Sequence, residues 1–405
     1  MNVLLLNHNV AWRSTFFRCL AFGRQLVRRG HRVTLVTTRP SGRFGVRSDE
    51  VDGVELALMP DLASGMARGG WDPSNVLRRL LFLRGRRFDL VHAFDCRPVV
   101  IHPALLARRL RGAPLVIDWA DWWGRGGAIT ERSGWVVRHG FSPIETFYEE
   151  HYRRRADWTT AISTALADRV AGLGVDPDRV TVIPGGAGLE RFAPLARDAA
   201  RAGLGLPLDA PLVLFAGFVQ YDLDLVLESF RVVAAEVPAA RLVLCGPRSP
   251  VAGAFRERHP QVAERVLEAG VVGFESMPSY LAAADVLLLP LRDSITNRGR
   301  WPNKLGEYLA MGRPVVTNPT GDVGALLERT GAGLLAGSEP ASFGAAVVEL
   351  LRDPDARELL GERARATAEA ELDYAHLAGR LLDVYGKVAG RGVGGASPTR
   401  EAARG

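Results

Sequence analysis

The residues best placed to bind a phosphorylated ligand lie in one short segment, RWPNKLGEYLAMGRPVV at 300–316. Pro302 stands where the first turn of a helix is expected, and the free N–H groups at such a helix end attract a diphosphate. Lys304 adds a full positive charge beside those groups. Glu307 follows on the same helix face, where a carboxylate can accept hydrogen bonds from ribose hydroxyls. An ion pair between Lys304 and Glu307 on the helix surface is the structural alternative.

Lysine is rare in this chain, because Lys304 and Lys387 are the only two among 51 lysine and arginine residues. GC-rich coding explains most of that bias and the formal net charge of +6. A lysine kept at a helix start nevertheless indicates that a compact point charge is needed there. The alternative is a basic face that touches anionic lipid or a phosphorylated substrate. Its candidates are Arg78, Arg79, Arg84, Arg86, Arg87, Arg153, Arg154 and Arg155.

Aspartates and tryptophans follow an expected strand at 115–117, in the sequence DWADWW. Asp121 is placed to orient sugar hydroxyls or to assist in removing the acceptor proton, and a structural or capping role is the alternative. Asp118 is a second candidate in the same loop. Trp119 and Trp122 can stack on a sugar or an apolar aglycone, although tryptophans also serve simply as packing. We therefore expect a catalytic Asp121 and acceptor contacts from the other three.

The loop after the first expected strand reads NHNVAWRSTFF. It lacks a G-x-G-x-x-G pattern, so this region is a poor dinucleotide site. Trp12, Arg13 and Ser14 are instead expected to contact the acceptor or a donor phosphate, or else to form an ordinary surface loop. Asp222 and Asp224 form a D-x-D, which binds metal in some transferases, but capping explains them better at a helix start. No metal site is expected.

Alternating short apolar runs and amphipathic segments predict two α/β domains. A chain of 405 residues is too long for one ordinary domain of this class. An apolar run at 3–6, a helix at 16–29 and another run at 33–36 form a βαβ unit, which indicates a parallel sheet. A second such series includes a helix at 262–268 and a strand at 271–273.

We expect four regions: 1–195 and 205–370 for two Rossmann-like domains, 371–388 for a helix that packs back on the first domain, and 389–405 for a disordered tail. Residues 192–211, rich in Ala, Arg, Pro and Gly, are the expected linker. The three cysteines lie far apart, which argues against a zinc site or a disulfide framework. With no leader and no apolar run of ~18 residues, we expect a cytoplasmic protein. Peripheral contact with the inner face of the membrane is the alternative.

Several segments together resemble GT-B glycosyltransferases of family 4, and the resemblance covers about residues 1–388. The segments are FGRQLVRRGHRVTLVTTRP, FDLVHAF, ADWTTAISTALADRVAGLGVDPDRVTVIPGGAGLERF, LAAADVLLLP and RGRWPNKLGEYLAMGRPVV. The resemblance implies an α/β, GT-B fold of two facing Rossmann-like, doubly wound domains. It also implies a C-terminal helix that returns to the first domain.

The resemblance further implies a retaining sugar transfer from a nucleotide-diphosphate sugar, with no metal and no other cofactor. The donor would bind the second domain and the acceptor mainly the first. Glu307 would hold the donor ribose, Lys304 with the neighbouring amides of Asn303 and Leu305 would hold the diphosphate, and Phe274 would contact the base. The acceptor is expected to be a small molecule or lipid-linked: a natural-product aglycone, an aminocyclitol, or a lipid-linked or polysaccharide intermediate. No basic motif of a nucleic-acid binder occurs, so nucleic acid is not an expected partner.

Three departures from the family pattern limit these expectations. The family's usual first glutamate is Gly299 here. The loop after the first strand of the second domain keeps Gly217 as a donor contact but lacks the family's two cations. The usual histidine of the first domain aligns with Ala120. The phosphate charge would then fall on Lys304, Arg298, Arg300 or Arg292.

Two alternatives to a transferase remain. A non-catalytic GT-B subunit that partners an active transferase would explain the missing glutamate and cations. A nucleotide-sugar epimerase would share the fold and the donor site but would need no acceptor. A phosphorylase would need a pyridoxal lysine, which two lysines in the whole chain make improbable.

Overall fold

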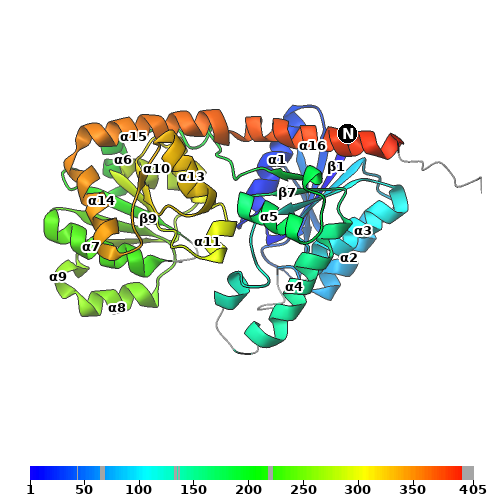
Figure 1. The fold of residues 1–405 in the computed structure, drawn as a ribbon, viewed down its shortest axis with the longest axis horizontal. Coiled ribbons are helices and arrows are strands. Elements are labelled where there is room, and N and C mark those ends of the chain that lie inside the picture. The colour runs from blue at the N-terminus through cyan, green and yellow to red at the C-terminus, as the bar shows by residue number, and fades with distance from the viewer. Residues whose placement is uncertain (43, 64–68, 132–134, 136, 218–221, 395–405) are drawn as a thin grey trace, which may run out of the picture. The chain divides into compact units, whose positions relative to one another are not determined.

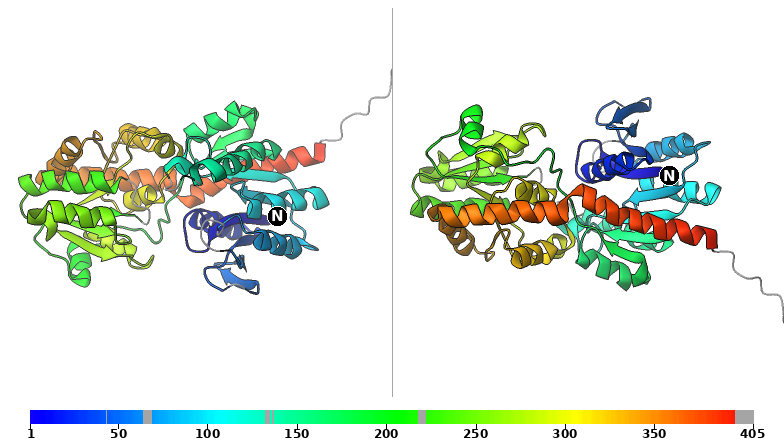
Figure 2. Two further views of the ribbon diagram at one scale, coloured as in Figure 1. Left: turned by 90° about the horizontal axis from the view of Figure 1, so that it is seen from below. Right: turned by 90° about the horizontal axis from the view of Figure 1, so that it is seen from above.

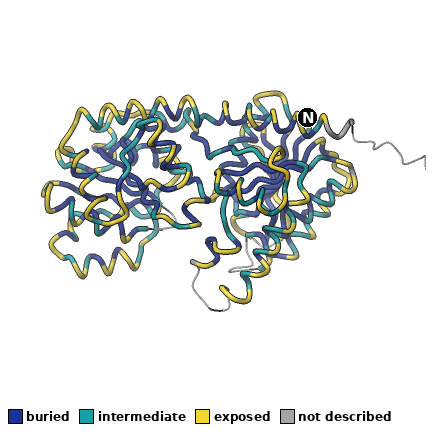
Figure 3. The backbone as a smooth tube through the Cα atoms, in the orientation of Figure 1, coloured by how far each residue is buried: buried dark blue, intermediate teal, exposed yellow. Residues whose placement is uncertain are grey.

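The computed structural model describes residues 1–42, 44–63, 69–131, 135, 137–217 and 222–394, which form two compact units (Figure 1). Unit 1 comprises Met1–Ile162, Leu166–Ile183 and the chain from Leu377 onward. Unit 2 comprises Ser163–Ala165 and Pro184–His376. In each unit the central strands are buried, whereas the edge strands β3, β8 and β14 are exposed or only partly buried (Figure 3). Among the described residues, no helix is both long and apolar enough to cross a membrane.

Unit 1 is built on an eight-stranded sheet of order β3-β4-β2-β1-β5-β6-β7-β8. Its strands are β1 (Asn2–Val10), β2 (Arg32–Thr38), β3 (Arg47–Val51), β4 (Val54–Met59), β5 (Leu90–Phe94), β6 (Leu115–Trp119), β7 (Trp158–Ala161) and β8 (Val180–Val182). All neighbours are parallel except β3 and β4, which form an antiparallel hairpin. The hairpin turns at Asp52 and Gly53, which both have positive φ, as a two-residue turn requires.

The helices of unit 1 follow the strands in an alternating order. They are α1 (Phe16–Arg28), α2 (Pro73–Leu83), α3 (Pro98–Arg111), α4 (Ser142–His151), most of α5 (Thr164–Gly172) and α16 (Tyr374–Gly394). Shorter turns are η2 (Ala128–Glu131), η3 (Val137–Phe141), η4 (Arg153–Arg155) and η5 (Pro177–Arg179). The parallel strands and intervening helices confirm the predicted Rossmann-like character of this unit.

Unit 2 has a six-stranded, fully parallel sheet of order β11-β10-β9-β12-β13-β14. The strands are β9 (Leu212–Ala216), β10 (Arg241–Cys245), β11 (Val266–Gly270), β12 (Val286–Leu289), β13 (Val315–Thr317) and β14 (Leu334–Leu335). The helices are α6 (Arg197–Leu204), α7 (Leu223–Glu236), α8 (Pro250–Arg258), α9 (Pro260–Ala263), α10 (Met277–Ala283), α11 (Ile295–Gly299), α12 (Asn303–Ala310), α13 (Gly321–Thr330), α14 (Pro340–Arg352) and α15 (Pro354–Thr367), followed by η6 (Ala368–Leu372). The strand order reverses between β9 and β12, which makes their carboxyl ends the topological switch point.

The segment expected to be a linker is a packed part of unit 2. Helix α6 lies within it, and the guanidinium of Arg201 is buried. Arg201 donates to the carbonyl oxygens of Ala283 and Leu208 and to the carboxylate of Asp285. These hydrogen bonds tie the segment to α10 and to the residue before β12. The main part of unit 2 therefore begins at Pro184 rather than near residue 205.

The helix expected at 262–268 and the strand expected at 271–273 are both wrong. Helix α9 ends at Ala263, and β11 begins at Val266, whose side chain is buried beside β10. Val271 is instead exposed. A short apolar run fits a helix or a strand equally well, so the pattern alone could not place this strand.

Helix α16 returns to unit 1, as the sequence predicts, and Figure 2 shows it along that unit in both views. The hydroxyl of Tyr385 lies 2.8 Å from His92 Nδ1 in β5. Arg380 donates to the carbonyl oxygen of Val182 at 2.6 Å. The helix continues to Gly394, so residues 389–394 are helical rather than disordered. The rest of the expected tail, 395–405, lies outside the described residues.

Replacing Tyr385 with phenylalanine should destabilise unit 1. The change removes one hydroxyl and leaves buried His92, whose pKa burial lowers to about 4, without that hydrogen-bond partner. A buried polar atom left unpaired costs about 1–3 kcal/mol. We expect the free energy of unfolding, measured by urea titration, to fall by that amount. An unchanged value would mean that the Tyr385–His92 hydrogen bond contributes nothing to the attachment of α16.

Candidate active site

Helix α12 is fixed at the switch point of the unit 2 sheet. The hydroxyl of Tyr308, buried in α12, lies 3.0 Å from the backbone nitrogen of Ala216, the last residue of β9. Leu305 and Leu309 are buried on the same side of the helix. The opposite side, with Lys304 and Glu307, stays partly exposed. The helix therefore presents its two charged residues at the place where open α/β sheets bind ligands.

Glycines let the segment before α6 approach α12 closely. A Cβ on Gly306 would stand 2.7 Å from the carbonyl oxygen of Gly186. A Cβ on Gly185 would stand 2.6 Å from Trp301 Cδ1. Both contacts are shorter than real side chains tolerate, so neither glycine can be replaced without movement of the backbone or of Trp301. The IPGGAG and RWPNKLGEY segments thus form one packed unit.

Lys304 and Glu307 form an ion pair, with Nζ 3.1 Å from Oε2. The structure thus contains the surface ion pair that the sequence offered as the alternative to ligand binding. A pair at this helical spacing contributes only about 0.2–0.5 kcal/mol. A phosphate could take Lys304 away from Glu307 at little cost, so the pair does not oppose the predicted roles.

The other predicted cations of this site also have carboxylate partners or lie partly buried. Arg298 binds Asp293 in a bidentate pair at 2.5 Å, on the surface. Arg292 binds Asp224 at 2.8 Å. Arg300 follows α11, and its side chain is half-buried. Exposed pairs of this kind are worth about 0–1 kcal/mol, so Arg298 can turn to a ligand more readily than a buried arginine could.

The D-x-D pair lies at the start of α7 and also binds Arg292. Asp224 stands in the first turn of the helix, where a carboxylate is favoured by the helix dipole, but Asp222 makes no side-chain capping hydrogen bond, which corrects the capping part of the interpretation. Its Oδ2 accepts from Asn297 Nδ2 at 3.1 Å and from the Arg292 backbone at 3.3 Å. The two aspartates therefore order the loop after β12, because both hold Arg292.

Phe274 lies on the surface of unit 2, with 39% of its area exposed. The guanidinium of Arg191 stacks over its ring at 3.9 Å and also contacts Glu275 at 2.5 Å. Phe192 meets the same ring edge-on at 6.0 Å. The sequence analysis singled out Phe274 but missed Arg191, whose stacking position is set by the fold.

Gly217 and Gly299 stand at the two departures from the family pattern. Gly217 continues the β9 ladder by donating to the carbonyl oxygen of Cys245. The residues after it, 218–221, lie outside the described residues, and Phe218 and Tyr221 with them. Gly299 ends α11, is buried, and accepts a hydrogen bond from Ser163 Oγ at 2.8 Å. No side chain at 299 can attend a sugar, so another group must do so if one is needed.

In unit 1, Asp118 and Trp119 do not reach solvent, so the expectation that they touch an acceptor is not met. Asp118 is 1% exposed, and Arg18 binds both of its carboxylate oxygens, at 3.1 and 3.2 Å. Thr160 Oγ1 donates to the same carboxylate at 2.6 Å. Trp119 is also buried, with Arg153 over its ring at 3.8 Å. Both residues lie in β6, where side chains from the helices beside the sheet cover them: Arg18 of α1 covers Asp118, and Glu149 of α4 and Arg169 of α5 contact Trp119.

The remaining acceptor candidates lie in loops at the carboxyl ends of β1 and β6, which β5 separates in the sheet. Trp12 is exposed and Ser14 is too, and both have positive φ, as strained functional loops often do. Arg13 lies exposed between them. Asp121 and Trp122 are half-buried, and Arg169 stacks over the Trp122 ring at 4.2 Å.

Glu149 of α4 holds the loop that carries Asp121. Its carboxylate accepts hydrogen bonds from Trp119 Nε1 at 2.9 Å, from the backbone of Trp123 at 3.1 Å and from the backbone of Gly124 at 2.5 Å. Burial raises the pKa of Glu149 to about 7, against the opposing charges of Arg153 and Arg169.

A group of charged residues that the sequence analysis did not single out surrounds Asp95, just after β5. Asp95 Oδ2 lies 3.6 Å from His8 Nδ1 and 3.7 Å from Arg97 Nε, and its Oδ1 lies 3.6 Å from Arg153 Nη2. The two arginines lie at ion-pair distances from Asp95 without hydrogen bonds to it, and the contact with His8 is not a hydrogen bond either; His8 Nδ1, Arg97 Nε, Arg153 Nη2 and Asp95 Oδ2 are buried. Asp95 has positive φ, a strained state for this residue. Burial and the charge of Arg97 lower the pKa of His8 to about 3, so its ring is neutral.

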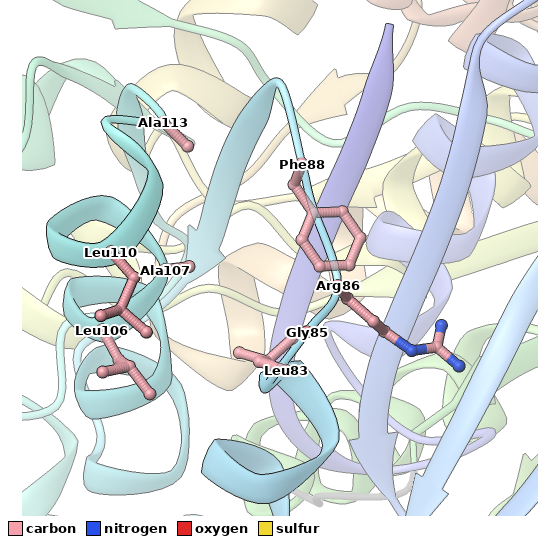
Figure 4. A pocket seen from close by; sticks show the side chains of 8 residues that line it. All are labelled: Leu83, Gly85, Arg86, Phe88, Leu106, Ala107, Leu110 and Ala113. Carbon is pink, nitrogen blue, oxygen red and sulfur yellow. The ribbon is translucent and has the colours of Figure 1, made fainter.

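An apolar hollow between α2 and α3 lies at the opposite edge of this sheet (Figure 4). Leu83, Phe88, Leu106 and Leu110 line it, with Arg86 at the side. It adjoins the start of β5, whereas ligands of open α/β sheets bind beyond the carboxyl ends of the strands. Arg86 is also engaged with Glu55 at 2.8 Å. We assign this hollow to packing.

Comparisons with known proteins agree on one family. A model of the glycosyl transferase 4-like domain matches residues 18–186, and a model of glycosyl transferases group 1 matches residues 210–353. A D-inositol 3-phosphate glycosyltransferase of Thermobispora bispora is 30% identical over 330 residues, which are 77% of this chain and 73% of that protein.

A protein of the same name from Xylanimonas cellulosilytica is 32% identical over 238 residues, 55% of each chain. The chain therefore spans little more than half the length of that relative. The solved structure of Anabaena HepE in complex with UDP-glucose has 16% identity and a TM-score of 0.69, and the match covers 96% of this chain and 100% of that one. At that identity the likeness concerns the fold, which is the predicted GT-B type.

Replacing Gly306 with alanine should destabilise unit 2, although alanine is the better helix former. The new Cβ would collide with the Gly186 carbonyl oxygen, and overpacking costs about 1–3 kcal/mol. Gly253→Ala in α8 is the matched control, because nothing lies within 4 Å of its Cβ position. The control should gain up to about 1 kcal/mol. Urea titration measures both, and equal gains would contradict the close approach of the two segments.

Stability should also depend on pH through Glu149. Because its folded pKa of about 7 exceeds that of the unfolded chain, its contribution is full below pH ~4.5 and is lost as pH rises through 7. Glu149→Gln cannot titrate. From pH 5 to pH 8 the wild type should therefore lose about 1–3 kcal/mol relative to this variant in urea titrations. Parallel pH curves would show that Glu149 is already ionised at pH 5.

Proposed function

Because this chain belongs to glycosyltransferase family 4, we propose that it transfers a sugar from a nucleotide-diphosphate sugar to an acceptor hydroxyl, with retention of anomeric configuration. The observation that carries the proposal is the position of Lys304 and Glu307. They stand on α12, beside the switch point of a parallel sheet, where nucleotides bind in folds of this class.

The donor diphosphate would bind Lys304 and backbone N–H groups at the start of α12, where Asn303 and Leu305 lie. The N–H of Leu305 donates to the carbonyl oxygen of Pro302 at 3.0 Å and would have to turn from it to the phosphate. Glu307, released from its ion pair, would then accept hydrogen bonds from the ribose hydroxyls. The ion pair between Lys304 and Glu307 thus holds both side chains near the proposed positions of the diphosphate and the ribose. Arg298 and Arg300 would add charge from the turn before the helix, with Gly217 close to the phosphates.

The nucleotide base would stack at Phe274. Arg191 already covers that ring, and the half-exposed Phe274 with its guanidinium neighbour forms a planar, apolar and cationic surface. Stacking of this kind tolerates different bases. The base of the donor is therefore a matter for experiment, and UDP is the first to test.

In the transfer, the bond between the anomeric carbon and the diphosphate oxygen breaks, and the acceptor oxygen bonds to that carbon from the same face. The acceptor proton passes to the departing diphosphate. Lys304 and the helix amides would stabilise the charge that grows on the leaving group, because fixed donors aimed at developing charge need no reorganisation. We propose no cofactor beyond the nucleotide sugar itself.

The acceptor would bind unit 1 near Trp12, Arg13, Ser14, Asp121 and Trp122. A cyclitol phosphate is the first acceptor to test, because the matched relatives are named for D-inositol 3-phosphate. The aminocyclitol, aglycone and lipid-linked classes remain alternatives to it. Asp121 would orient acceptor or sugar hydroxyls from the loop that Glu149 holds.

Recognition of a phosphate on the acceptor would need a cation of unit 1 that can bind it. Arg97 pairs with Glu145 at 2.7 Å, and Arg18 with Asp118 at 3.1 Å. Arg153 faces Asp95. Each of these three arginines has a carboxylate beside it, and Arg13 is an exposed cation in the loop after β1. Comparison of inositol with inositol 3-phosphate as acceptors would decide whether that phosphate is recognised.

Lys304→Ala should weaken UDP binding by about 10- to 100-fold, because a hydrogen bond to a charged group is worth about 1.5–3 kcal/mol. The affinity for uridine, which has no phosphate, should not change. Lys387→Ala is the matched control, since it removes the only other lysine, which lies in α16. Calorimetric titration of the wild type and the two variants with UDP and uridine measures these affinities, and GDP and dTDP are titrated in parallel.

Glu307→Ala should lower the affinity for UDP and for uridine alike, because both carry the ribose. If Lys304→Ala kept the wild-type preference for UDP over uridine, and Glu307→Ala bound both as the wild type does, the donor site would be refuted. Binding without release of nucleoside diphosphate in the presence of any acceptor would favour the non-catalytic subunit. Release of free sugar derivative without an acceptor would favour the epimerase.

A further inference from the structure

Helix α4 carries its charges on the buried side and its apolar groups on the exposed side. Glu145 and Glu149 are buried, one helical turn apart. Ile144 and Phe147, on the other side, are 47% and 51% exposed. A surface helix of a globular protein normally has the reverse arrangement. The orientation of α4 therefore needs a physical cause.

Hydrogen bonds to the two buried carboxylates supply that cause. Glu145 pairs with Arg97 at 2.7 Å, and Glu149 accepts three hydrogen bonds, one from Trp119 at the end of β6 and two from the loop after it. A rotation of α4 that buried Ile144 and Phe147 would bring both carboxylates to the surface and break these bonds. Unit 1 therefore holds the apolar side of the helix outward.

The apolar surface extends beyond the helix itself. Trp135 is 70% exposed and stacks on His139, with ring centroids 5.0 Å apart. A surface hollow beside α4 is lined by Pro143, Thr146, Phe147 and His151, with Arg125, Ser142, Glu150 and Arg154 around it. Phe147 and Arg154 line this hollow together. We call Ile144, Phe147 and Arg154, with the exposed residues Trp135, Arg138 and Arg155 that precede or follow α4 in the chain, the α4 face.

The charges of the α4 face are basic. Arg138, Arg154 and Arg155 are exposed, and no described carboxylate pairs with them. Glu150, the acidic residue of α4 nearest the surface, is already bound by Arg125 and Arg169 at 2.9 Å. Of the basic residues that the sequence offered for a lipid contact, Arg79 and Arg153 are buried and cannot take part. Arg154 and Arg155 are exposed and follow α4, whereas Arg78, Arg84, Arg86 and Arg87 lie in α2 or directly after it.

We propose that the α4 face binds the surface of an anionic lipid bilayer. Exposed aliphatic and aromatic side chains beside unpaired arginines are the pattern of an interfacial helix, which enters the headgroup region and is attracted by anionic lipids. A second copy of this chain fits less well, because it would bring the same arginines together. The proposal does not depend on sugar transfer.

Sedimentation of the full chain with lipid vesicles tests the proposal. The probes are vesicles of phosphatidylcholine alone and of phosphatidylcholine mixed with phosphatidylglycerol. The wild type should bind the anionic vesicles only, and less at high salt, because screening weakens the attraction of exposed charges. Arg154→Gln with Arg155→Gln should lower the partition coefficient by roughly tenfold or more.

Ile144→Ser with Phe147→Ser should lower the partition coefficient for anionic vesicles further. Leu77→Ser with Leu81→Ser is the matched control, because these leucines of α2 are each 57% exposed and lie outside the α4 face. The control should bind as the wild type does. Circular dichroism and UDP titration of each variant separate loss of lipid binding from unfolding or from failure of the donor site.

Two outcomes would overturn the proposal. Equal binding of wild type and both α4 variants to anionic vesicles would show that another surface is responsible. A dimer of the wild type that Ile144→Ser with Phe147→Ser dissociates, without any vesicle binding, would identify the α4 face as a contact between copies of the chain.

Discussion

The buried carboxylate of Glu149 is the constraint on which the Asp121 loop of unit 1 depends. It accepts hydrogen bonds from the indole N–H of Trp119, at the end of β6, and from two backbone N–H groups of the loop that follows. That loop carries Asp121, and the helix that carries Glu149 is turned by the same bonds. One ionisable group, kept out of water, therefore sets both the position of a polar loop and the direction of an apolar surface. The cost of burying it appears as its raised pKa.

In unit 2 the corresponding constraint is close backbone approach rather than charge. Gly185 and Gly306 admit contacts that no other residue could make, and Tyr308 ties α12 to the end of β9. The charged residues of that helix contribute little to its position, since Lys304 and Glu307 form only a weak surface pair. The groups that hold α12 are therefore different from the groups that would face a ligand. Lys304 and Glu307 can exchange their partners without moving the helix.

The sequence predicted the features whose causes are local. The start of α12 follows from Pro302 and the charged residues after it, and the parallel sheets follow from short apolar runs between helices. The β3–β4 hairpin also had a local signal, the Asp52-Gly53 turn, which the analysis overlooked. Burial of Asp118 was not predictable in this way, because it depends on Arg18 a hundred residues earlier in the chain.

The same limit explains the errors in unit 2. Arg201 looked like part of a polar linker, and only its partners at Ala283 and Asp285 reveal it as a buried link. The strained backbone of Asp95 and the ions around it likewise result from tertiary packing. Residue type and spacing identify candidates for chemistry, whereas exposure and partners are properties of the complete fold.

The return of α16 to unit 1 bears on the order of events during synthesis. The first 183 residues leave the ribosome without the helix that supplies Tyr385 to His92 and Arg380 to Val182. Domains generally fold as they emerge, amino-terminal first. Here the strands that α16 contacts, among them β5 and β8, remain without that helix until all of unit 2 has been translated.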